Sequence, residues 1–128
     1  MTFPEEAWAK LAKNGFTTKK GAIFDVAITA GTMALKKTSE TIPFCHPIPI
    51  DGSSISIAPD ENKRALIVRC SVKTTARTGV EMEAMTGASA TGLTLYDMTK
   101  SLELGIEISS VRLLSKTGGK SDFKSKND

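Results

Sequence analysis

The chain of 128 residues has few of the features that mark secreted, membrane-bound or metal-dependent proteins. Two cysteines are too few for the disulfide framework of a small secreted domain, so a reducing, cytoplasmic location is the simplest interpretation. One histidine without a CxxC or HExxH motif predicts no dedicated metal site, and we expect no cofactor. No apolar run approaches the length of a membrane span, and the N-terminus does not resemble a signal peptide, so we expect no membrane partner.

Aromatic residues are also scarce, at 5% of the chain, so we expect a core of Ile, Leu, Val, Ala and Met. Hydrophobic residues at 40% and charged residues at 24% are the balance of a soluble globular protein, and the length predicts one domain over residues 1–128. The net charge is only +3, and no block of Lys and Arg is interleaved with aromatics. This argues against a nucleic-acid partner and is compatible with a small anionic substrate.

Turn residues divide the first half of the chain into short segments. A helix is expected over residues 5–13, followed by a polar, lysine-bearing loop over 17–21. A second helix is expected over about 23–38, because its apolar residues repeat at helical spacing. Residues 42–49 contain three prolines in seven positions, which excludes a helix or a central strand and predicts a stiff, extended segment.

The second half combines strands with one long helix. Alternation of polar and apolar residues predicts a strand over 53–58, which forms a hairpin with a strand over 65–75. The long helix is expected from about Gly79 to Gly105, with Thr78 starting a capping box. The remaining predictions are a strand over 106–114 and a polar tail over 116–128. This order predicts an α+β fold, a ferredoxin-like two-layer sandwich with helices on one face of an antiparallel sheet.

Two candidate binding segments each have a structural and a functional explanation. Phe44, Cys45 and His46 lie among prolines that fix the backbone and so the direction of the side chains. A lone histidine is more often structural, but this setting brings the two explanations close to balance. Glu81 and Glu83 either complement the dipole of the long helix or accept hydrogen bonds from the amino and amide groups of a purine or pterin ring.

Two further segments carry charge. Asp97 and Lys100 share a face of the long helix, where spacing alone favours a surface ion pair over an acid–base pair in a cleft. Residues 116–121 hold two lysines around a double glycine, but Leu114 stands where a P-loop needs its first glycine. This segment either wraps a phosphate chain or is a basic tail.

Helix geometry separates the acidic candidates. Glu83 and Asp97 lie about 21 Å apart along an ideal helix, at about 1.5 Å per residue. One small ligand cannot easily touch both within one chain, so the ligand is long or a second subunit completes the site. Between them, Gly87 and Gly92 each cost on the order of 1 kcal/mol in a helix interior. Because small residues let another backbone come close, we predict that this stretch lies at a contact between subunits.

Four segments, in this order, resemble the MoaC family, and together they cover about residues 16–123. They are residues 36–47 (KKTSETIPFCHP), 73–84 (KTTARTGVEMEA), 95–100 (LYDMTK) and 111–121 (VRLLSKTGGKS). The resemblance implies a lyase of molybdenum cofactor biosynthesis, cyclic pyranopterin monophosphate synthase. Its substrate is a cyclised GTP derivative, 3′,8-cyclo-7,8-dihydro-GTP, made by a partner radical enzyme, and pyrophosphate is released. The implied fold is ferredoxin-like, and the implied assembly is a homo-oligomer, a hexamer built as a trimer of dimers with sites at subunit interfaces.

The resemblance also implies roles for individual residues. Asp97 matches the catalytic aspartate, a general acid and base, and Lys100 matches an essential lysine that holds charge on the ring system. The binding residues that it implies are the loop residues Phe44, Cys45 and His46, the helix residues Glu81, Met82 and Glu83, and the triphosphate-binding lysines Lys20, Lys116 and Lys120.

Two departures from the family pattern leave a second hypothesis open. The family usually begins with a strand reading MVDV and a basic loop with an arginine, whereas this sequence starts close to the helix expected at residue 5, so we expect this N-terminal strand either to be missing or to lie before residue 1. The family's Lys-Gly-Asp is here residues 20–22, KGA. The second hypothesis is a catalytically weak oligomeric module that binds a purine nucleotide or a partner. Retention of Asp97, Lys100 and His46 favours the enzyme.

Overall fold

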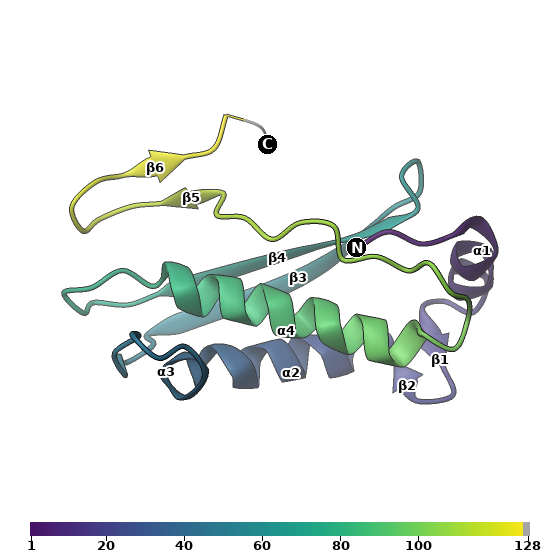
Figure 1. Cartoon of the computed structure of the whole chain (residues 1–128), viewed down its shortest axis with the longest axis horizontal. Coiled ribbons are helices and arrows are strands. Elements are labelled where there is room, and N and C mark those ends of the chain that lie inside the picture. Colours follow the sequence, from purple (N-terminus) through teal and green to yellow (C-terminus); the bar gives the residue numbers. More distant parts are fainter. Residues whose placement is uncertain (127–128) are drawn as a thin grey trace.

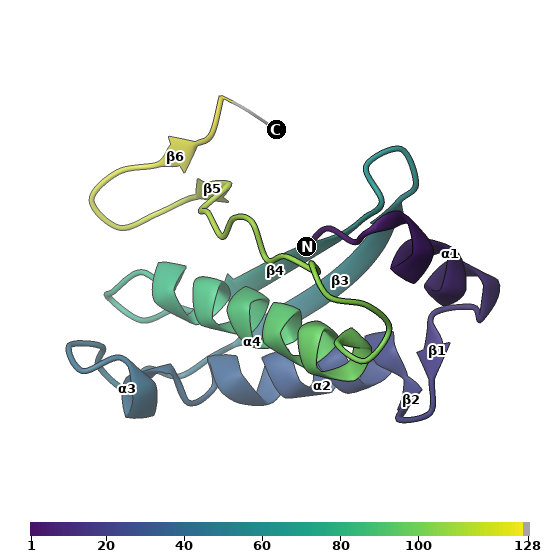
Figure 2. The same ribbon diagram turned by 45° about the vertical axis from the view of Figure 1, so that its right-hand side comes forward.

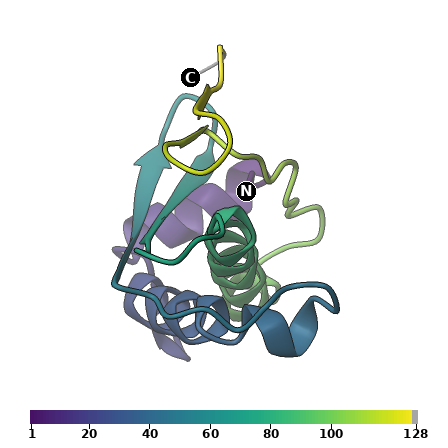
Figure 3. The same ribbon diagram turned by 90° about the vertical axis from the view of Figure 1, so that its left-hand side faces the viewer.

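The computed structural model describes residues 1–126, in which helices and antiparallel strands form two layers (Figure 1). A hairpin of β3 (Gly52–Asp60) and β4 (Ala65–Lys73) is covered by α2 (Ile23–Leu35) and α4 (Glu81–Thr99), which pack against each other on one face of it (Figure 3). The predicted α+β class is therefore confirmed. The other elements are α1 (Glu5–Lys13), β1 (Thr17–Thr18), β2 (Gly21–Ala22), α3 (Thr38–Thr41), β5 (Ser115–Lys116) and β6 (Phe123–Lys124).

The central hairpin matches its prediction, although β3 is longer than predicted at both ends and β4 ends two residues earlier. Ile55 lies opposite Cys70 and Ile57 opposite Val68, and this alternation places partly buried side chains on the helix-covered face. β3 continues through Pro59, where the sequence predicts a turn. A proline is tolerated there because β3 lies at the edge of the sheet and its missing N–H faces no further strand.

The N-terminal residues extend this sheet beyond β4. Thr2 bridges antiparallel to Ala65 on one side and to Glu107 on the other, and the N–H of Thr2 donates to the Glu107 carbonyl at 2.8 Å. The order across the sheet, β3, β4, residues 1–3 and Glu107, agrees with a ferredoxin-like arrangement. The predicted strand over 106–114 is wrong beyond this one bridge, because its neighbour, residues 1–3, is too short to pair with nine residues.

The long helix is shorter than predicted at both ends. Its N-cap is Val80, which makes no side-chain cap hydrogen bond, so the predicted capping box is wrong. The Glu81 carboxylate instead folds back to its own backbone N–H. At the other end the helix stops at Thr99, and the Glu103 carboxylate accepts a hydrogen bond from the Ala7 N–H in α1 at 3.1 Å. No helix in the described range 1–126 is long and apolar enough to cross a membrane.

Two segments that the sequence predicts as irregular form small hairpins. The loop over 17–21 belongs to the hairpin β1–β2, with a two-residue turn at Lys19 and Lys20. The polar tail contains the hairpin β5–β6, and its last two residues, 127 and 128, lie outside the described part of the chain. The helix predicted over 23–38 also divides, because α2 ends at Leu35. There the Thr38 hydroxyl donates to the Leu35 carbonyl at 2.9 Å.

The aliphatic core predicted from composition is only partly right. Besides Leu11, Leu66 and Leu95, the buried core contains aromatic residues at the α1 end of the molecule. The rings of Phe3 and Trp8 lie 5.8 Å apart, and the series continues through partly buried aromatic residues. Few aromatic residues are present, but four of them, Phe3, Trp8, Phe16 and Phe24, form one continuous series of ring contacts.

The glycines of α4 bring two helices of the same chain together. A Cβ at Gly31 in α2 would lie 2.1 Å from the Thr91 hydroxyl oxygen and 2.8 Å from the Gly87 carbonyl oxygen. A Cβ at Gly87 would lie 2.8 Å from the Cys70 sulfur. The predicted close approach of a second backbone is therefore present within one chain, and the predicted contact between subunits stays a prediction. Gly92 likewise lies against Ile108.

Replacing Ala22 with aspartate is expected to stabilise the protein. Ala22 is the N-cap of α2 and leaves the first helical N–H groups without a side-chain acceptor. An aspartate there should contribute about 0.5–2 kcal/mol. Each kcal/mol should raise Tm by roughly 2–8 °C in thermal unfolding. Ala22→Leu, which cannot cap, is the control, and equal melting of the two variants would contradict the prediction.

Candidate active site

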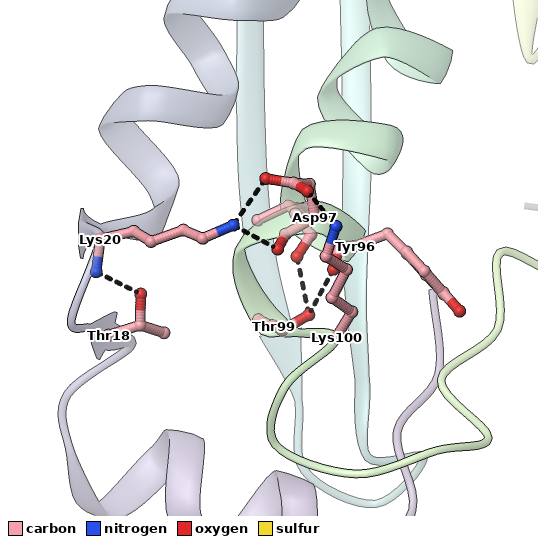
Figure 4. Close-up of polar contacts among 7 residues, drawn as sticks. Thr18, Lys20, Tyr96, Asp97, Thr99 and Lys100 are labelled. Carbon is pink, nitrogen blue, oxygen red and sulfur yellow. Dashed lines mark hydrogen bonds and ion pairs between the residues drawn. The ribbon is translucent and has the colours of Figure 1, made fainter.

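Three charged side chains from two distant segments meet at the C-terminal end of α4 (Figure 4). The Lys20 ammonium donates to Asp97 Oδ2 at 2.8 Å and to the Asp97 backbone carbonyl at 2.9 Å. The Lys100 ammonium donates to Asp97 Oδ1 at 2.6 Å. Each oxygen of one carboxylate therefore faces a different cation, although Lys20 lies 77 residues before Asp97.

Two elements hold this cluster. Asp97 lies in the last turn of α4, and Lys100 is the C-cap, whose N–H donates to the Tyr96 carbonyl at 2.8 Å. The buried Thr99 hydroxyl donates to the Leu95 carbonyl at 2.7 Å. Lys20 comes from the turn of the β1–β2 hairpin and reaches across to the helix (Figure 4). The three side chains are each about half exposed, so a ligand in solution can reach them.

The two lysines determine the charge state of Asp97. Their hydrogen bonds, Lys100 first and Lys20 second, together with their positive charges, lower the pKa of Asp97 to about 2. Hydrogen bonding to Asp97 and its negative charge raise the pKa of Lys100 in turn. At neutral pH the resting cluster therefore holds a carboxylate and two ammonium groups.

The ionisation of Asp97 gives a direct test of this cluster. We expect the Asp97 side-chain carboxyl carbon to titrate near pH 2 in ¹³C NMR, and at a higher pH in Lys100→Met and in Lys20→Met. Because its pKa is lower when folded than when unfolded, its stabilising contribution is present above about pH 4 and is lost as the pH falls toward 2. Lys19→Met is the matched control and should leave the Asp97 pKa unchanged. An equally unchanged pKa in Lys20→Met or in Lys100→Met would contradict the described contacts.

At the opposite end of α4, the helix begins beside α3 (Figure 2). A pocket of about 220 Å³ there is lined by residues from α2, α3, the extended segment and α4, including Lys36, His46 and Glu83. Glu83 is buried, with 5% of its surface exposed, whereas His46 is exposed. The structure therefore brings His46 and Glu83, which are far apart in the sequence, to one pocket.

The other residues of these two segments differ in exposure. The side chain of Phe44 is 97% exposed, and Met82 is 38% exposed. Cys45 is a partly buried free thiol whose backbone N–H donates to the Ile42 carbonyl at 3.1 Å. An almost fully exposed phenylalanine cannot contribute to the core of this chain, so its apolar surface is available to a ligand or another molecule.

The C-terminal hairpin joins the same end of α4. The Lys116 ammonium contacts Glu81 Oε1 at 2.8 Å, and this hydrogen bond lowers the pKa of Glu81. The turn of the hairpin contains Gly118 and Gly119 at positive φ, and the Gly118 N–H donates to the Asp122 carboxylate at 2.8 Å. The predicted phosphate-binding glycine loop is thus an ordered turn. Lys120 is exposed beside it.

The predicted site residues therefore form two groups rather than one. Lys20, Asp97 and Lys100 lie at the C-terminal end of α4, whereas His46, Glu83, Glu81 and Lys116 lie near its N-terminal end. The 14 positions from Glu83 to Asp97 span about 21 Å of helix at about 1.5 Å per residue.

Sequence reasoning missed two neighbours of these groups. Lys36 lines the pocket of Glu83, although its place at a helix end suggests only an interaction with the dipole. Asp122 binds the glycine turn, and the only signal for it is its short separation from the double glycine. Among residues 1–126, no cluster of three His, Cys, Asp or Glu side chains could hold a metal ion.

Comparisons with known proteins agree with the resemblance. The model of a family described as the MoaC family matches residues 1–119. A cyclic pyranopterin monophosphate synthase of Xanthomonas oryzae pv. oryzae is 50% identical over 123 residues, which are 96% of this chain and 74% of that protein. A cyclic pyranopterin monophosphate synthase of Nostoc sp. is 50% identical over 104 residues, which are 81% of this chain and 62% of that protein. Molybdenum cofactor biosynthesis protein 1 of Dictyostelium discoideum is 52% identical over 104 residues, which are 81% of this chain and 16% of that protein.

Proposed function

The chain belongs to the MoaC family, and from this premise we propose that it is a cyclic pyranopterin monophosphate synthase, a lyase of molybdenum cofactor biosynthesis. It converts 3′,8-cyclo-7,8-dihydro-GTP to cyclic pyranopterin monophosphate, with pyrophosphate as the released group. The observation that supports the mechanism is the meeting of Lys20 with Asp97 and Lys100, because it places a carboxylate between two cations on an accessible surface.

In this proposal Asp97 moves protons and Lys100 holds charge. An Asp with a pKa of about 2 is a weak base, and acid–base catalysis is most effective when the pKa lies near the working pH. In this proposal the Asp97 pKa is therefore higher when substrate is bound than it is in the cluster without substrate. A triphosphate that attracts the Lys20 ammonium removes one of the two partners that lower the Asp97 pKa. Exposed ion pairs contribute at most about 1 kcal/mol, so a polyanion can displace this one.

The second group supplies recognition. Glu83 is buried at the pocket wall, where its carboxylate can accept hydrogen bonds from the amino and amide groups of the purine-derived ring. His46 lines the same pocket, and its chain neighbours Phe44 and Cys45, with Met82 next to Glu83, are proposed to contact the ring as well. These residues position the ring.

Lysines of the C-terminal hairpin complete the phosphate site in this proposal. Lys116 is paired with Glu81, which holds the hairpin against the start of α4. Lys120 is exposed next to the glycine turn and is free to follow a phosphate group. Charge from these lysines would stabilise the leaving pyrophosphate.

A second subunit unites the two groups. Because they lie at opposite ends of one helix, we propose that the Asp97 end of one protomer faces the Glu83 pocket of another, within a hexamer arranged as a trimer of dimers. The exposed side chains of Phe44, Leu93 and Tyr96 provide apolar surface for such contacts. We further propose a cytoplasmic location, consistent with two free cysteines, and a supply of substrate by a radical enzyme.

Incubation of the purified protein with 3′,8-cyclo-7,8-dihydro-GTP tests the function. Formation of cyclic pyranopterin monophosphate, with an equal amount of pyrophosphate, is the expected result. GTP, which lacks the cyclised ring, is the control and should not be converted. Tight binding of the substrate without any product would instead support the binding module that lacks catalysis.

A further inference from the structure

Thr18 lies in the hairpin that carries Lys20 and has no role in the chemistry proposed above. β1 and β2 have two residues each, with Thr17 opposite Ala22 and Thr18 opposite Gly21. A two-stranded hairpin is marginally stable at best in water. The two backbone pairs of β1 and β2 therefore do little to fix the turn between them. Lys20 must nevertheless place its ammonium within 3 Å of two oxygens of Asp97.

One hydrogen bond inside the turn supplies the missing constraint. The Lys20 backbone N–H donates to the Thr18 hydroxyl oxygen at 3.2 Å (Figure 4). This is the side-chain turn that Ser and Thr make with the backbone two residues later. Gly21 follows with a φ of +109°, a conformation that suits glycine and lets the chain return into β2.

The direction of the Lys20 side chain depends on this turn. Lysine has a flexible four-carbon stem, so its backbone must start in the right place if the ammonium is to occupy one position often. The close-up shows the Thr18 contact at the backbone end of Lys20 and the Asp97 contacts at its other end (Figure 4).

We propose that Thr18 is a positioning residue whose hydroxyl fixes the turn of the β1–β2 hairpin, so that Lys20 meets Asp97. The proposal rests on the proposed function, because Lys20 and Asp97 take their roles from it. Thr18 itself touches no reacting group. It acts by raising the fraction of time that the Lys20 ammonium spends at the cluster.

The chain offers a matched control in the neighbouring threonine. Thr18→Val removes the acceptor and keeps the shape, and Thr18→Ser keeps the hydroxyl. Thr17→Val makes the same chemical change one residue earlier, where the hydroxyl has only a 3.5 Å contact with the Gly15 carbonyl. Two quantities are measured in each variant: the pKa of the Asp97 carboxyl by ¹³C NMR, and kcat and KM for product formation.

We expect Thr18→Val to raise the Asp97 pKa, because Lys20 is one of the two cations that lower it. We expect kcat/KM to fall roughly two- to tenfold, the range for one hydrogen bond, because a Lys20 ammonium that is not held beside Asp97 is no longer in place to receive the triphosphate proposed above. Thr18→Ser should resemble wild type, and so should Thr17→Val. In a Lys20→Met background, Thr18→Val should change the Asp97 pKa no further, since groups that act through one another are not additive.

Several outcomes would overturn the proposal. They are an unchanged Asp97 pKa in Thr18→Val, equal effects in Thr17→Val, or a Thr18→Ser variant that behaves like Thr18→Val. Thermal unfolding shows whether a variant is folded, and Thr18→Ala is the second variant if valine prevents folding. The NMR measurement needs no substrate, so a wild type that forms no product would refute the proposed function while leaving Thr18 testable.

Discussion

Asp97→Asn is expected to form cyclic pyranopterin monophosphate about 10²–10⁴-fold more slowly than wild type, the usual contribution of a positioned acid or base. Asparagine keeps the shape of the side chain but removes its charge and its capacity to carry a proton. The stability of the variant should change little, because the cluster lies on the surface. Single-turnover product formation and thermal unfolding on the same preparation check both parts.

The same experiment includes Lys100→Ala and the double variant. If both residues act on one reacting centre, the double variant should be hardly slower than the slower single variant. Thr94→Val is the control, since its hydroxyl binds the Ala90 carbonyl in the same helix and is not part of the cluster. A rate near that of wild type in Asp97→Asn would sink the mechanism and leave the family membership standing.

Mixed oligomers should recover activity that neither parent has. Asp97→Asn damages the group at one end of α4, and Glu83→Gln damages the pocket at the other end. If each site takes one group from each of two protomers, random mixing leaves about a quarter of the sites with both groups intact. Co-expression with two different tags, tandem purification and a product assay measure this recovery.

A second mixture provides the control. Asp97→Asn mixed with Lys100→Ala places both defects in the same group, so every site keeps one defect and the mixture should stay as slow as its parents. Equal recovery in both mixtures, or none in the Asp97 and Glu83 mixture, would show that the two groups do not form a shared site.

The candidate site was only partly predictable. The spacing of Asp97 and Lys100 places them on one helix face, since residues three apart are neighbours on any α-helix. Spacing alone favoured an ion pair, and the ion pair is present. The contact between Lys20 and Asp97 could not be predicted from neighbouring residues, because it depends on the direction of a hairpin 77 residues earlier in the chain. For the same reason, periodicity could not show that His46, Lys36 and Glu83 share a pocket.

Errors in the fold prediction have a common cause. The expected capping box failed because the carboxylate of Glu81 folds back to its own N–H, and the expected strand over 106–114 failed because residues 1–3 give it a single pairing position. The pattern around Gly87 indicated a close neighbour but not which one, and in the structure Cys70 of β4 and Leu35 of α2 lie there. In each case the local sequence was compatible with more than one neighbouring group, and the packing of the whole chain determined which neighbour is present.

The sequence by itself determined the α+β class, the central hairpin, the places of α1, α2 and α4, and the family, because periodicity, turn residues and ordered motifs are properties of short segments. Only the tertiary structure decided which segments meet. Gly31 and Gly87 let α2 and α4 come into contact, and the turn after β1 brings Lys20 to Asp97. Contacts between residues far apart in the sequence depend on the combined packing of many side chains, and no short segment contains that information.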